Sequence, residues 1–529
     1  MAGRLASGRL GEHFVAGVAT PGSGAAFTAI DPTTGAAVGP TYHEATAAEV
    51  ERAAQAAGAV AGAFAAAGGP TRAGLLRGIA GRIEALGDEL LACYGQETAL
   101  PRARAEAELA RTLGQLRRFA DLAAEGAWVD ARIDRALPQR QPVPRPDLRR
   151  MLVGIGPVVV FGASNFPLAY SVAGGDTASA LAAGCPVLVK GHPAHPGTSE
   201  LVGRAIAAAV HDAGLPGGVF SLLHGASHEL GAALVRHPAV AAVGFTGSHR
   251  GGRALMDLAA ARPEPIPVFA EMGSMNPVVV LPEALANRGA AIGKQVAASA
   301  LLASGQFCTS PGLILWIDGP GAAELREALR DHLGAAVGAP TVHPSIRDGY
   351  VAALGEVLRL PVQVESRGQT APAATAVCPT LLTAAPAALL GNPRLRSEIY
   401  GPAVLAVACA DAAELRAVLQ SLHGHLTGTV HGEGRDFASH GAALAVLRRK
   451  VGRLLANGVP TGVEVCGAMV HGGPYPAAAD ARFSAVGPTS ILRWARPMCW
   501  QDWPAELLPP ELRDDNPLGI RRTVDDVVV

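Results

Sequence analysis

A regular alternation of strand-like and helix-like runs between residues 152 and 271 constrains the fold of this 529-residue chain more than any other feature. The strand-like runs are short and apolar, and the helix-like runs are rich in Ala. This order predicts a parallel sheet covered by helices, because neighbouring parallel strands need a long crossover connection. Such a sheet binds its ligands beyond the carboxyl ends of its strands. We therefore look for functional residues where the strands end.

The expected elements follow one another without long gaps. We predict strands over Leu152–Phe161, Val187–Lys190, Val219–Leu222, Val240–Phe245 and Ile266–Glu271, and helices over Gly175–Ala183, Gly197–Asp212, Glu229–Arg236 and Gly251–Ala261. A second α/β region from about residue 273 to 467 is expected to contain strands over Pro277–Leu281 and Leu313–Trp316 and helices over Ile292–Ser304, Ala322–His332 and Val446–Asn457.

The residues before this alternation have a different character. Residues 1–42 contain Gly, Thr and Pro between short apolar stretches, which predicts weak strands or a hairpin. A helical region is expected from Thr46 to about Gly126, because Thr46 and Glu49 have the spacing of a capping box. The segment Pro138–Pro146 contains four prolines and two arginines, so it predicts a linker or an extended arm.

The composition excludes several classes of function. The net charge is −1 and the acidic and basic residues are scattered, so no surface for nucleic acid or an acidic membrane is expected. No apolar run has the roughly 18 residues of a membrane span, and the first twenty residues do not resemble a secretory signal. The seven cysteines form no CxxC pair, which predicts a reducing cytoplasm and neither disulfides nor a metal site.

The loop from Gly305 to Gly312 holds one cysteine, Cys308, between a helix-like run and an apolar strand. A thiol on such a turn can face a pocket, and backbone N–H groups beside it can stabilise an oxyanion. The alternative is a buried cysteine that serves only as a small apolar side chain. The strand ends decide between these two interpretations.

Two strand ends carry groups that a catalytic cysteine needs. Asn165 follows the first strand and could donate its amide N–H to an oxyanion, although an Asn before Phe166-Pro167 also suits a plain turn. Glu271 follows the apolar stretch Ile266–Ala270, where a buried carboxylate could act as a base. A structural salt bridge is the alternative for Glu271.

Further strand ends suit a nucleotide. Lys190 ends a strand, where it could bind a ribose or phosphate or simply reach solvent. Gly247 and Ser248 precede a helix whose N-terminus could meet a pyrophosphate, although ordinary helix caps look alike. Glu398 precedes a Gly-Pro turn, where a solvated acid is the default. The chain contains no GxGxxG fingerprint.

The order and spacing of these motifs resemble the aldehyde dehydrogenase superfamily over nearly the whole chain. The matching motifs are those at Asn165, Lys190, Phe245-Thr246-Gly247-Ser248, Glu271-Met272-Gly273, Gly305-Gln306-Phe307-Cys308 and Glu398-Ile399-Tyr400-Gly401-Pro402. Phe161–Thr198 and His471–Tyr475 resemble more narrowly the branch of 2-oxoglutarate semialdehyde (2,5-dioxovalerate) dehydrogenases and related NADP-linked fatty aldehyde dehydrogenases.

The resemblance implies an α/β fold with a Rossmann-type cofactor domain, an α/β catalytic domain and a small oligomerisation element. The corresponding boundaries are 1–137 and 151–271 for the cofactor domain, 272–470 for the catalytic domain, and 138–150 and 471–529 for the oligomerisation arm and tail. A homodimer or homotetramer is expected. The tail holds three of the five tryptophans (494, 500 and 503), which suits a subunit contact or intrachain packing equally well.

The resemblance also implies a role for each motif. Cys308 would attack a small-molecule aldehyde, Asn165 and the Cys308 N–H would hold the oxyanion, and Glu271 would activate water against the resulting thioester. The implied contacts to NAD or NADP come from Phe161, Gly162, Lys190, His192, Pro193, Gly247, Ser248 and Glu398.

Two positions depart from many relatives. Pro193 stands where many carry an acid that excludes a 2′-phosphate, so with Lys190, His192 and His195 nearby NADP is mildly favoured and NAD stays possible. Asp176 stands where many carry a lysine, which makes a proton relay at that position doubtful.

The implied reaction is oxidation of 2,5-dioxovalerate to 2-oxoglutarate, and a longer aliphatic aldehyde is the alternative substrate. A cysteine hydrolase would need a histidine partner that no motif supplies. A CoA-acylating dehydrogenase should lack Glu271, and a catalytically silent relative should lack Cys308 or Asn165.

Overall fold

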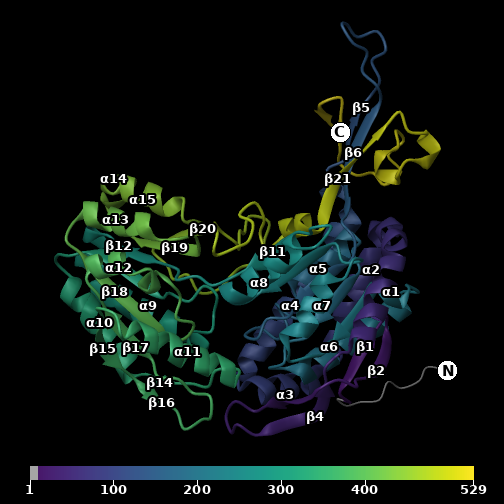
Figure 1. Cartoon of the computed structure of the whole chain (residues 1–529). Coiled ribbons are helices and arrows are strands. Elements are labelled where there is room, and N and C mark those ends of the chain that lie inside the picture. Colours follow the sequence, from purple (N-terminus) through teal and green to yellow (C-terminus); the bar gives the residue numbers. More distant parts are fainter. Residues whose placement is uncertain (1–9) are drawn as a thin grey trace.

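The computed structural model describes residues 10–529, and it contains two seven-stranded sheets with their helices and a five-stranded sheet that projects away from both (Figure 1). The expectation for residues 1–9 lies outside the described residues. No helix within the described part of the chain is long and apolar enough to cross a membrane.

The first sheet has the order β11-β10-β7-β8-β9-β1-β2. Its bounds are β1 Glu12–Val15, β2 Val18–Pro21, β7 Val158–Phe161, β8 Val187–Lys190, β9 Phe220–Leu223, β10 Ala242–Thr246 and β11 Val268–Glu271. Strands β7 to β11 are parallel, and the chain proceeds from β7 to β9 in one direction and from β10 to β11 in the other. The strand order therefore reverses between β7 and β10, where Phe161 lies beside Phe245, and this reversal is where a doubly wound sheet opens a crevice.

Eight helices belong to this part of the chain. They are α1 Ala47–Ala66, α2 Gly68–Glu84, α3 Gly87–Thr98, α4 Arg102–Glu125, α5 Gly175–Ala183, α6 Pro196–Asp212, α7 His228–Arg236 and α8 His249–Ala260. The expected capping box is present, since Thr46 accepts from the Glu49 backbone and Glu49 reaches back to the Thr46 N–H. The predicted N-terminal strands occur as the hairpin β1–β2 and the pair β3 (Ala26–Ile30) and β4 (Ala37–His43).

The second sheet has the order β15-β17-β18-β13-β12-β19-β20 and is parallel except for β15. Its bounds are β12 Val278–Val280, β13 Leu313–Ile317, β15 Gln363–Arg367, β17 Thr380–Thr383, β18 Ala403–Cys409, β19 His425–His431 and β20 Val451–Ala456, and a separate short pair consists of β14 Val337–Gly338 and β16 Gln369–Thr370.

Helices cover both faces of this sheet. Val278 and Val280 of β12 join the core beneath α9 and α10, whereas Val279 joins the core that includes α13 and α15. Alternate strand residues thus enter opposite cores, as in a sheet buried on both sides. The helices of this region are α9 Pro282–Leu301, α10 Ala322–Ala335, α11 Pro344–Val357, α12 Pro386–Gly391, α13 Ala412–Ser421, α14 Asp436–Ser439 and α15 Gly441–Arg448.

Two expected elements differ from the structure. The strand predicted over Leu152–Phe161 is divided, because Gly156 adopts φ 122° and Pro157 follows it, so β6 (Leu148–Gly154) leaves the first sheet. The helix predicted over Val446–Asn457 is also wrong. Helix α15 ends at Arg448, and Val451–Ala456 forms β20, which pairs with β19 at the edge of the second sheet. Pairing with a neighbouring strand overrides weak local helical spacing here.

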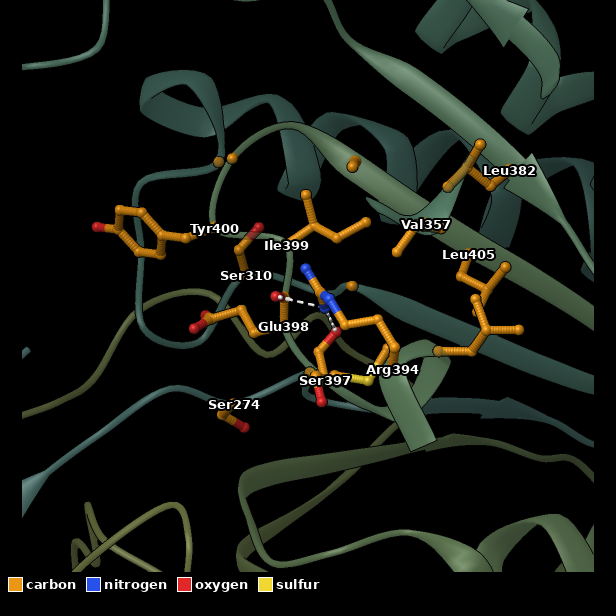
Figure 2. A pocket seen from close by; sticks show the side chains of 16 residues that line it. Ser274, Ser310, Val357, Leu382, Arg394, Ser397, Glu398, Ile399, Tyr400 and Leu405 are labelled. Atoms are coloured by element: carbon orange, nitrogen blue, oxygen red, sulfur yellow. Dashed lines mark hydrogen bonds between the residues drawn. The ribbon is translucent and has the colours of Figure 1, made fainter. Parts of the chain in front are cut away.

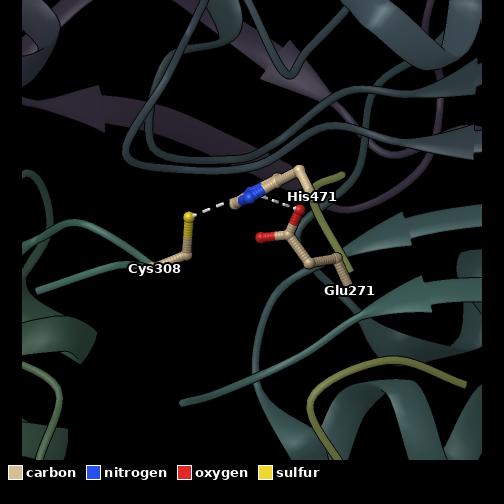
Figure 3. Close-up of side chains that lie close together, drawn as sticks. All are labelled: Glu271, Cys308 and His471. Carbon is tan, nitrogen blue, oxygen red and sulfur yellow. Dashed lines mark hydrogen bonds and ion pairs between the residues drawn. The ribbon is translucent and has the colours of Figure 1, made fainter. Parts of the chain in front are cut away.

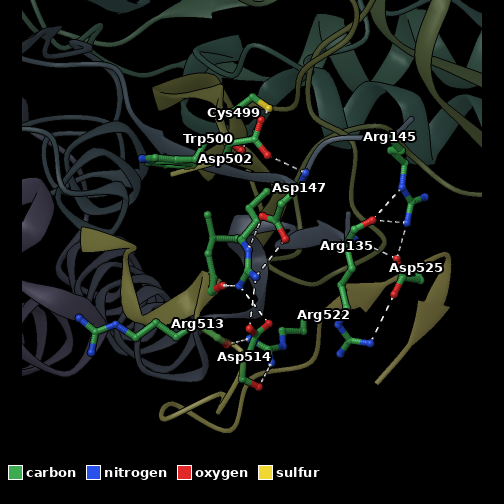
Figure 4. Close-up of polar contacts among 12 residues, drawn as sticks. Arg135, Arg145, Asp147, Cys499, Trp500, Asp502, Arg513, Asp514, Arg522 and Asp525 are labelled. Atoms are coloured by element: carbon green, nitrogen blue, oxygen red, sulfur yellow. Dashed lines mark hydrogen bonds and ion pairs between the residues drawn. The ribbon is translucent and has the colours of Figure 1, made fainter. Parts of the chain in front are cut away.

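The projecting sheet has the order β21-β6-β5-β22-β23, with β5 Arg132–Asp134, β21 Ala495–Gln501, β22 Thr523–Val524 and β23 Val527–Val528. Polar contacts tie the C-terminal segment to the arm (Figure 4). The buried Arg149 pairs with Asp147 and Asp514, and Asp525 pairs with Arg135 and Arg145. The arm and the C-terminal segment are therefore one structural unit.

The predicted tail contains two different parts. Residues 471–494 lie against the first sheet, since the Met272 N–H donates to Ala477 and Trp494 is fully buried against Phe269. Trp500 is partly buried in the projecting unit, and Trp503 is half exposed. The tryptophans thus serve intrachain packing at two of the three positions.

Candidate active site

Cys308 lies on the loop between α9 and β13, and the backbone before it is strained. Ala303, Ser304 and Gly305 adopt φ of 46°, 53° and 69°, which is a left-handed region that side-chain-bearing residues avoid. A Cβ at position 305 would lie 2.3 Å from the Gly401 carbonyl, so only glycine fits there. Strain of this kind is typical of functional loops and fixes the direction in which the sulfur points.

The sulfur of Cys308 meets two side chains from distant parts of the chain (Figure 3). Nε2 of His471 lies 3.5 Å from Sγ and 2.8 Å from Oε2 of Glu271, and single ligand atoms of the three residues lie within 4.8 Å of one another. Both His471 and Glu271 are buried. Burial raises the pKa of the Cys308 thiol well above its usual value, and the Glu271 carboxylate adds to this effect. The thiol therefore needs a base before it can attack, and the His471 ring is placed to accept its proton.

Glu271 occupies the end of β11 and has free acceptor capacity. Its backbone carbonyl accepts from the Gly247 N–H at 3.0 Å, which fixes its position at the crevice. Among the described residues, no donor makes a well-oriented hydrogen bond to either carboxylate oxygen, although His471 is within ion-pair distance. A buried carboxylate with unused lone pairs can hold and deprotonate a water molecule.

Asn165 follows β7 and reaches the cysteine loop from the other side of the crevice. Its Nδ2 donates to the Gln306 carbonyl at 2.9 Å. A side-chain amide has two N–H hydrogens, so the second remains for an oxygen atom near the sulfur.

Two residues of the site were missed in the sequence. Asn276, fully buried, donates Nδ2 to the carbonyls of Cys308 at 2.9 Å and Ser310 at 2.8 Å, and thereby holds the cysteine loop. The sequence offered one signal for Asn276, namely an Asn directly before Pro277. In the structure this residue has φ 49°, a left-handed conformation that Asn tolerates. His471 was noted only as part of a motif, so the expectation that no histidine partner exists for Cys308 is wrong.

The remaining candidates lie around the strand reversal between β7 and β10. The rings of Phe161 and Phe245 lie 6.0 Å apart, and the Gly162 N–H donates to the Lys190 carbonyl. Ser248 caps α8 by accepting from the Gly251 N–H at 3.2 Å. The N-terminus of α8 is thus directed at the same edge of the sheet, and it suits an anionic group such as a pyrophosphate.

The candidate nucleotide contacts beside β8 differ in charge. Burial lowers the pKa of Lys190 to about 8, and its Nζ donates to the Gly225 carbonyl at 2.7 Å. Burial also lowers the pKa of His192 well below its usual value and that of His195 to about 4. Both histidines are therefore neutral near pH 7, and with Pro193 uncharged, Lys190 supplies the positive charge in this group.

Glu398 lines a small cavity together with Ser274, Arg394 and Tyr400 (Figure 2). A Cβ at Gly273 would lie 2.3 Å from Oε2 of Glu398, so the glycine lets this carboxylate approach the backbone beside Glu271. Burial raises the pKa of Glu398 to about 8; a hydrogen bond from the Ser274 backbone lowers it, and the Glu271 charge raises it. A ribose hydroxyl is a suitable partner for such a carboxyl group.

Asp176 forms an ion pair with Arg493 at 2.6 Å. The guanidinium of Arg493 thus neutralises the Asp176 carboxylate. The ion pair therefore gives Asp176 a structural role.

The comparisons with known proteins agree with this geometry. Alpha-ketoglutaric semialdehyde dehydrogenase 2 of Azospirillum brasilense is 49% identical over 97% of this chain and 98% of its own, and alpha-ketoglutaric semialdehyde dehydrogenase of Acinetobacter baylyi is 44% identical over 98% of each. The crystal structure of a putative aldehyde dehydrogenase from Burkholderia cenocepacia shares the fold, with a TM-score of 0.77 and 24% identity over 93% of this chain and 99% of that one. The family model described as the aldehyde dehydrogenase family matches residues 19–473. The chain belongs to the aldehyde dehydrogenase family.

Proposed function

We propose that this aldehyde dehydrogenase oxidises 2-oxoglutarate semialdehyde (2,5-dioxovalerate) to 2-oxoglutarate with NAD(P). The substrate is supported by the two relatives named for this activity, which match nearly the full length of the chain. The observation that carries the chemistry is the meeting of Cys308, His471 and Glu271 within 4.8 Å at the edge of the crevice.

The first step is the attack of sulfur on the aldehyde carbon. His471 accepts the thiol proton at Nε2, which lies 3.5 Å from the sulfur, and the Glu271 carboxylate, 2.8 Å from the same nitrogen, stabilises the imidazolium that forms. The carbonyl oxygen becomes an oxyanion, which the second N–H of Asn165 and the backbone N–H of Cys308 stabilise. Asn276 keeps the sulfur in place by holding the carbonyl of Cys308.

The crevice suits a nicotinamide dinucleotide, which supplies the hydride acceptor when bound. Ser248 and the α8 N-terminus would hold the pyrophosphate, Lys190 the adenosine ribose and Glu398 the nicotinamide ribose. Phe161, Gly162, His192, Pro193 and Gly247 complete the predicted contacts around it. The fit rests on the capped helix end and on the half-buried Glu398 carboxyl beside Gly273.

Water then hydrolyses the thioester with help from Glu271. Its carboxylate is buried, and its oxygens have unused acceptor capacity among the described residues. Glu271 takes the proton from water, and the Cys308 thiol reforms as the acid leaves. In this mechanism His471 activates the sulfur in the first step, and Glu271 activates the water in the second.

Both cofactors are proposed to bind, with NADP favoured. Pro193 has no negative charge to repel a 2′-phosphate, and Lys190 can pair with one. Because His192 and His195 are neutral, Lys190 is the one positively charged side chain of these three, and the preference for NADP depends on it.

We further propose a cytoplasmic homodimer or homotetramer. No two cysteines form a disulfide among the described residues, which suits a reducing compartment. The projecting sheet exposes Val527 and Val528 on its edge strand β23, and its arm exposes Val143. Exposed apolar residues on a projecting edge suit contact with a second copy of the chain. Light scattering of the purified protein measures the oligomeric state.

The reaction is tested by the absorbance of the reduced cofactor when purified enzyme meets 2,5-dioxovalerate and NADP or NAD. The expected signal depends on Cys308 and disappears in Cys308→Ala. A higher kcat/KM for a long unbranched aliphatic aldehyde than for 2,5-dioxovalerate would overturn the proposed substrate, and a full signal from Cys308→Ala would overturn the mechanism.

A further inference from the structure

A short segment beside the active site, residues 460–463, is held by two arginines from different elements. Arg111 of α4 donates to the carbonyl of Val463, and Arg453 of β20 donates to the carbonyls of Pro460 and Gly462. Thr461 in the same segment donates to the carbonyl of Thr309, the neighbour of Cys308. We call residues 460–463 the clamped segment. It lies against the cysteine loop and between the two guanidinium groups.

Neither guanidinium has an anionic partner in the part of the chain that the structure describes. Among residues 10–529, no carboxylate lies within ion-pair distance of Arg111 or Arg453, and their Nε atoms are buried without a hydrogen-bond partner. Both side chains are half-buried. The nearby Arg104 shows the contrast, since it pairs with Glu108 and lies over the rings of two phenylalanines. A partly buried cation without a counter-ion is costly, and an anionic ligand removes that cost.

Arg111 is connected to the active site through Tyr170 and His471. Nη2 of Arg111 donates to the Tyr170 hydroxyl at 3.1 Å, and the Tyr170 ring lies 6.3 Å from the ring of His471. His471 in turn contacts the sulfur of Cys308. The Arg111 charge also acts on that thiol, whose pKa it lowers against the larger effect of burial. Two side chains, Tyr170 and His471, thus connect Arg111 to the reacting sulfur.

We propose that Arg111 and Arg453 form the subsite that binds the far carboxylate of the substrate. This inference rests on the proposed function, because it requires an aldehyde with an acid at its other end. In extended 2,5-dioxovalerate the aldehyde carbon lies about 5 Å from the carboxylate carbon, as bond lengths near 1.5 Å dictate. The carboxylate would then extend from the sulfur toward Tyr170 and the two guanidinium groups. Guanidinium groups suit it, because each can offer paired N–H donors to two oxygens.

The subsite also gives a reason for the clamped segment. The two arginines use Nη atoms to hold its carbonyls, so the segment fixes their planes before the substrate arrives. Preorganised donors lose little freedom on binding. The carboxylate then draws the aldehyde end toward Cys308 and orients the carbonyl carbon.

The test compares Arg111→Met and Arg453→Met with the wild-type enzyme on 2,5-dioxovalerate and on pentanal, an uncharged aldehyde with the same number of carbons. For the charged substrate we expect kcat/KM to fall about 30- to 100-fold in each variant, mainly through KM, since a lost charged hydrogen bond costs about this much. For pentanal we expect a much smaller fall, which the charged substrate shares, because Arg111 also lowers the pKa of the Cys308 thiol. Arg453→Lys should recover part of the loss, because it restores the charge without the planar pair of donors.

Arg117→Met is the matched control, because Arg117 lies on the same helix α4 but is exposed and pairs with Glu84. It should leave both substrates unchanged. A second measurement avoids turnover altogether: glutarate should slow the alkylation of Cys308 by iodoacetamide in the wild-type enzyme and not in Arg111→Met.

The outcomes separate the subsite from the proposed function. A wild-type enzyme with no preference for 2,5-dioxovalerate over pentanal overturns the proposed substrate. A wild-type preference that survives in both methionine variants overturns the subsite alone. If kcat/KM falls equally for the two aldehydes, the arginines act only by holding the clamped segment, and the subsite is overturned as well.

Discussion

The Nε2 atom of His471 lies 3.5 Å from the sulfur of Cys308, although 163 residues separate them in the chain. His471 belongs to a C-terminal loop that lies against β11, so the same loop that pairs with the end of that strand delivers the ring to the sulfur. A cysteine with a raised pKa is unreactive as a thiol, and this ring lies within contact distance of it.

We expect His471→Asn to lower kcat about 10²- to 10⁴-fold, because a positioned general base contributes about this much. The alkylation of Cys308 by iodoacetamide should slow as well and should require a higher pH. The measurement is the rate of alkylation against pH in both proteins. An unchanged alkylation profile would remove His471 from the activation of the sulfur.

Asn165→Ala should lower kcat more than it lowers stability. Loss of one oxyanion donor raises the barrier by about 3 kcal/mol, which corresponds to about two orders of magnitude in rate. The hydrogen bond to the Gln306 carbonyl is also lost, and a single hydrogen bond contributes about 1 kcal/mol to stability. Steady-state kinetics and thermal unfolding of the same preparation check this. A drop in melting temperature large enough to explain the lost activity would contradict the role.

Glu271→Gln should block the second half of the reaction. The sulfur can still attack, but water is no longer deprotonated and the thioester should accumulate. Rapid mixing should show one equivalent of reduced cofactor per site, followed by slow turnover, and mass spectrometry should show the acyl group on Cys308. A variant that loses the burst together with turnover would place Glu271 in the first step instead.

The sequence predicted several residues at the carboxyl edge of the first sheet but not the position of His471 beside Cys308. Lys190, Gly247 and Glu271 each follow an apolar strand, and parallel strands bring their carboxyl ends to one edge, so strand order alone gathers them. No such rule applies to His471. It follows a long irregular segment. Its position depends on two backbone hydrogen bonds that have no local signature: the Ala479 N–H donates to the carbonyl of Ala270 in β11, and the Met272 N–H donates to the carbonyl of Ala477.

The errors in the elements have a similar origin. β20 was predicted as a helix because its residues carry no strong strand pattern, and its conformation comes from pairing with β19. That error hid Arg453, since a helix would have directed its side chain differently. The acidic partners of most other arginines were equally invisible in the sequence, so the lack of one at Arg111 and Arg453 emerged only from the structure.

The preference for NADP should weaken as the pH rises above about 8. The pKa of Lys190 is lowered from 10.5 to about 8, so the lysine is charged below that pH and neutral above it. A neutral lysine no longer attracts a 2′-phosphate, whereas NAD has no such phosphate to lose. We expect kcat/KM for NADP to fall relative to NAD between pH 7 and 9.5. Lys190→Met should abolish this difference between the cofactors, and a ratio independent of pH in the wild-type enzyme would contradict it.

Zinc should inhibit the enzyme reversibly through the same three residues that carry the reaction. Thiolate, imidazole and carboxylate are its preferred ligands, and S and N atoms on a tetrahedral zinc ion lie about 3.5 Å apart. The separation of Cys308 Sγ and His471 Nε2 has this value. The thiolate and the Glu271 carboxylate would also balance the two charges of the ion in a buried site.

We expect micromolar zinc to abolish activity, EDTA to restore it and magnesium to have no effect. Cobalt should give a thiolate charge-transfer band that is lost in Cys308→Ala and weakened in His471→Asn; a band that survives in both variants would move the metal to another part of the chain.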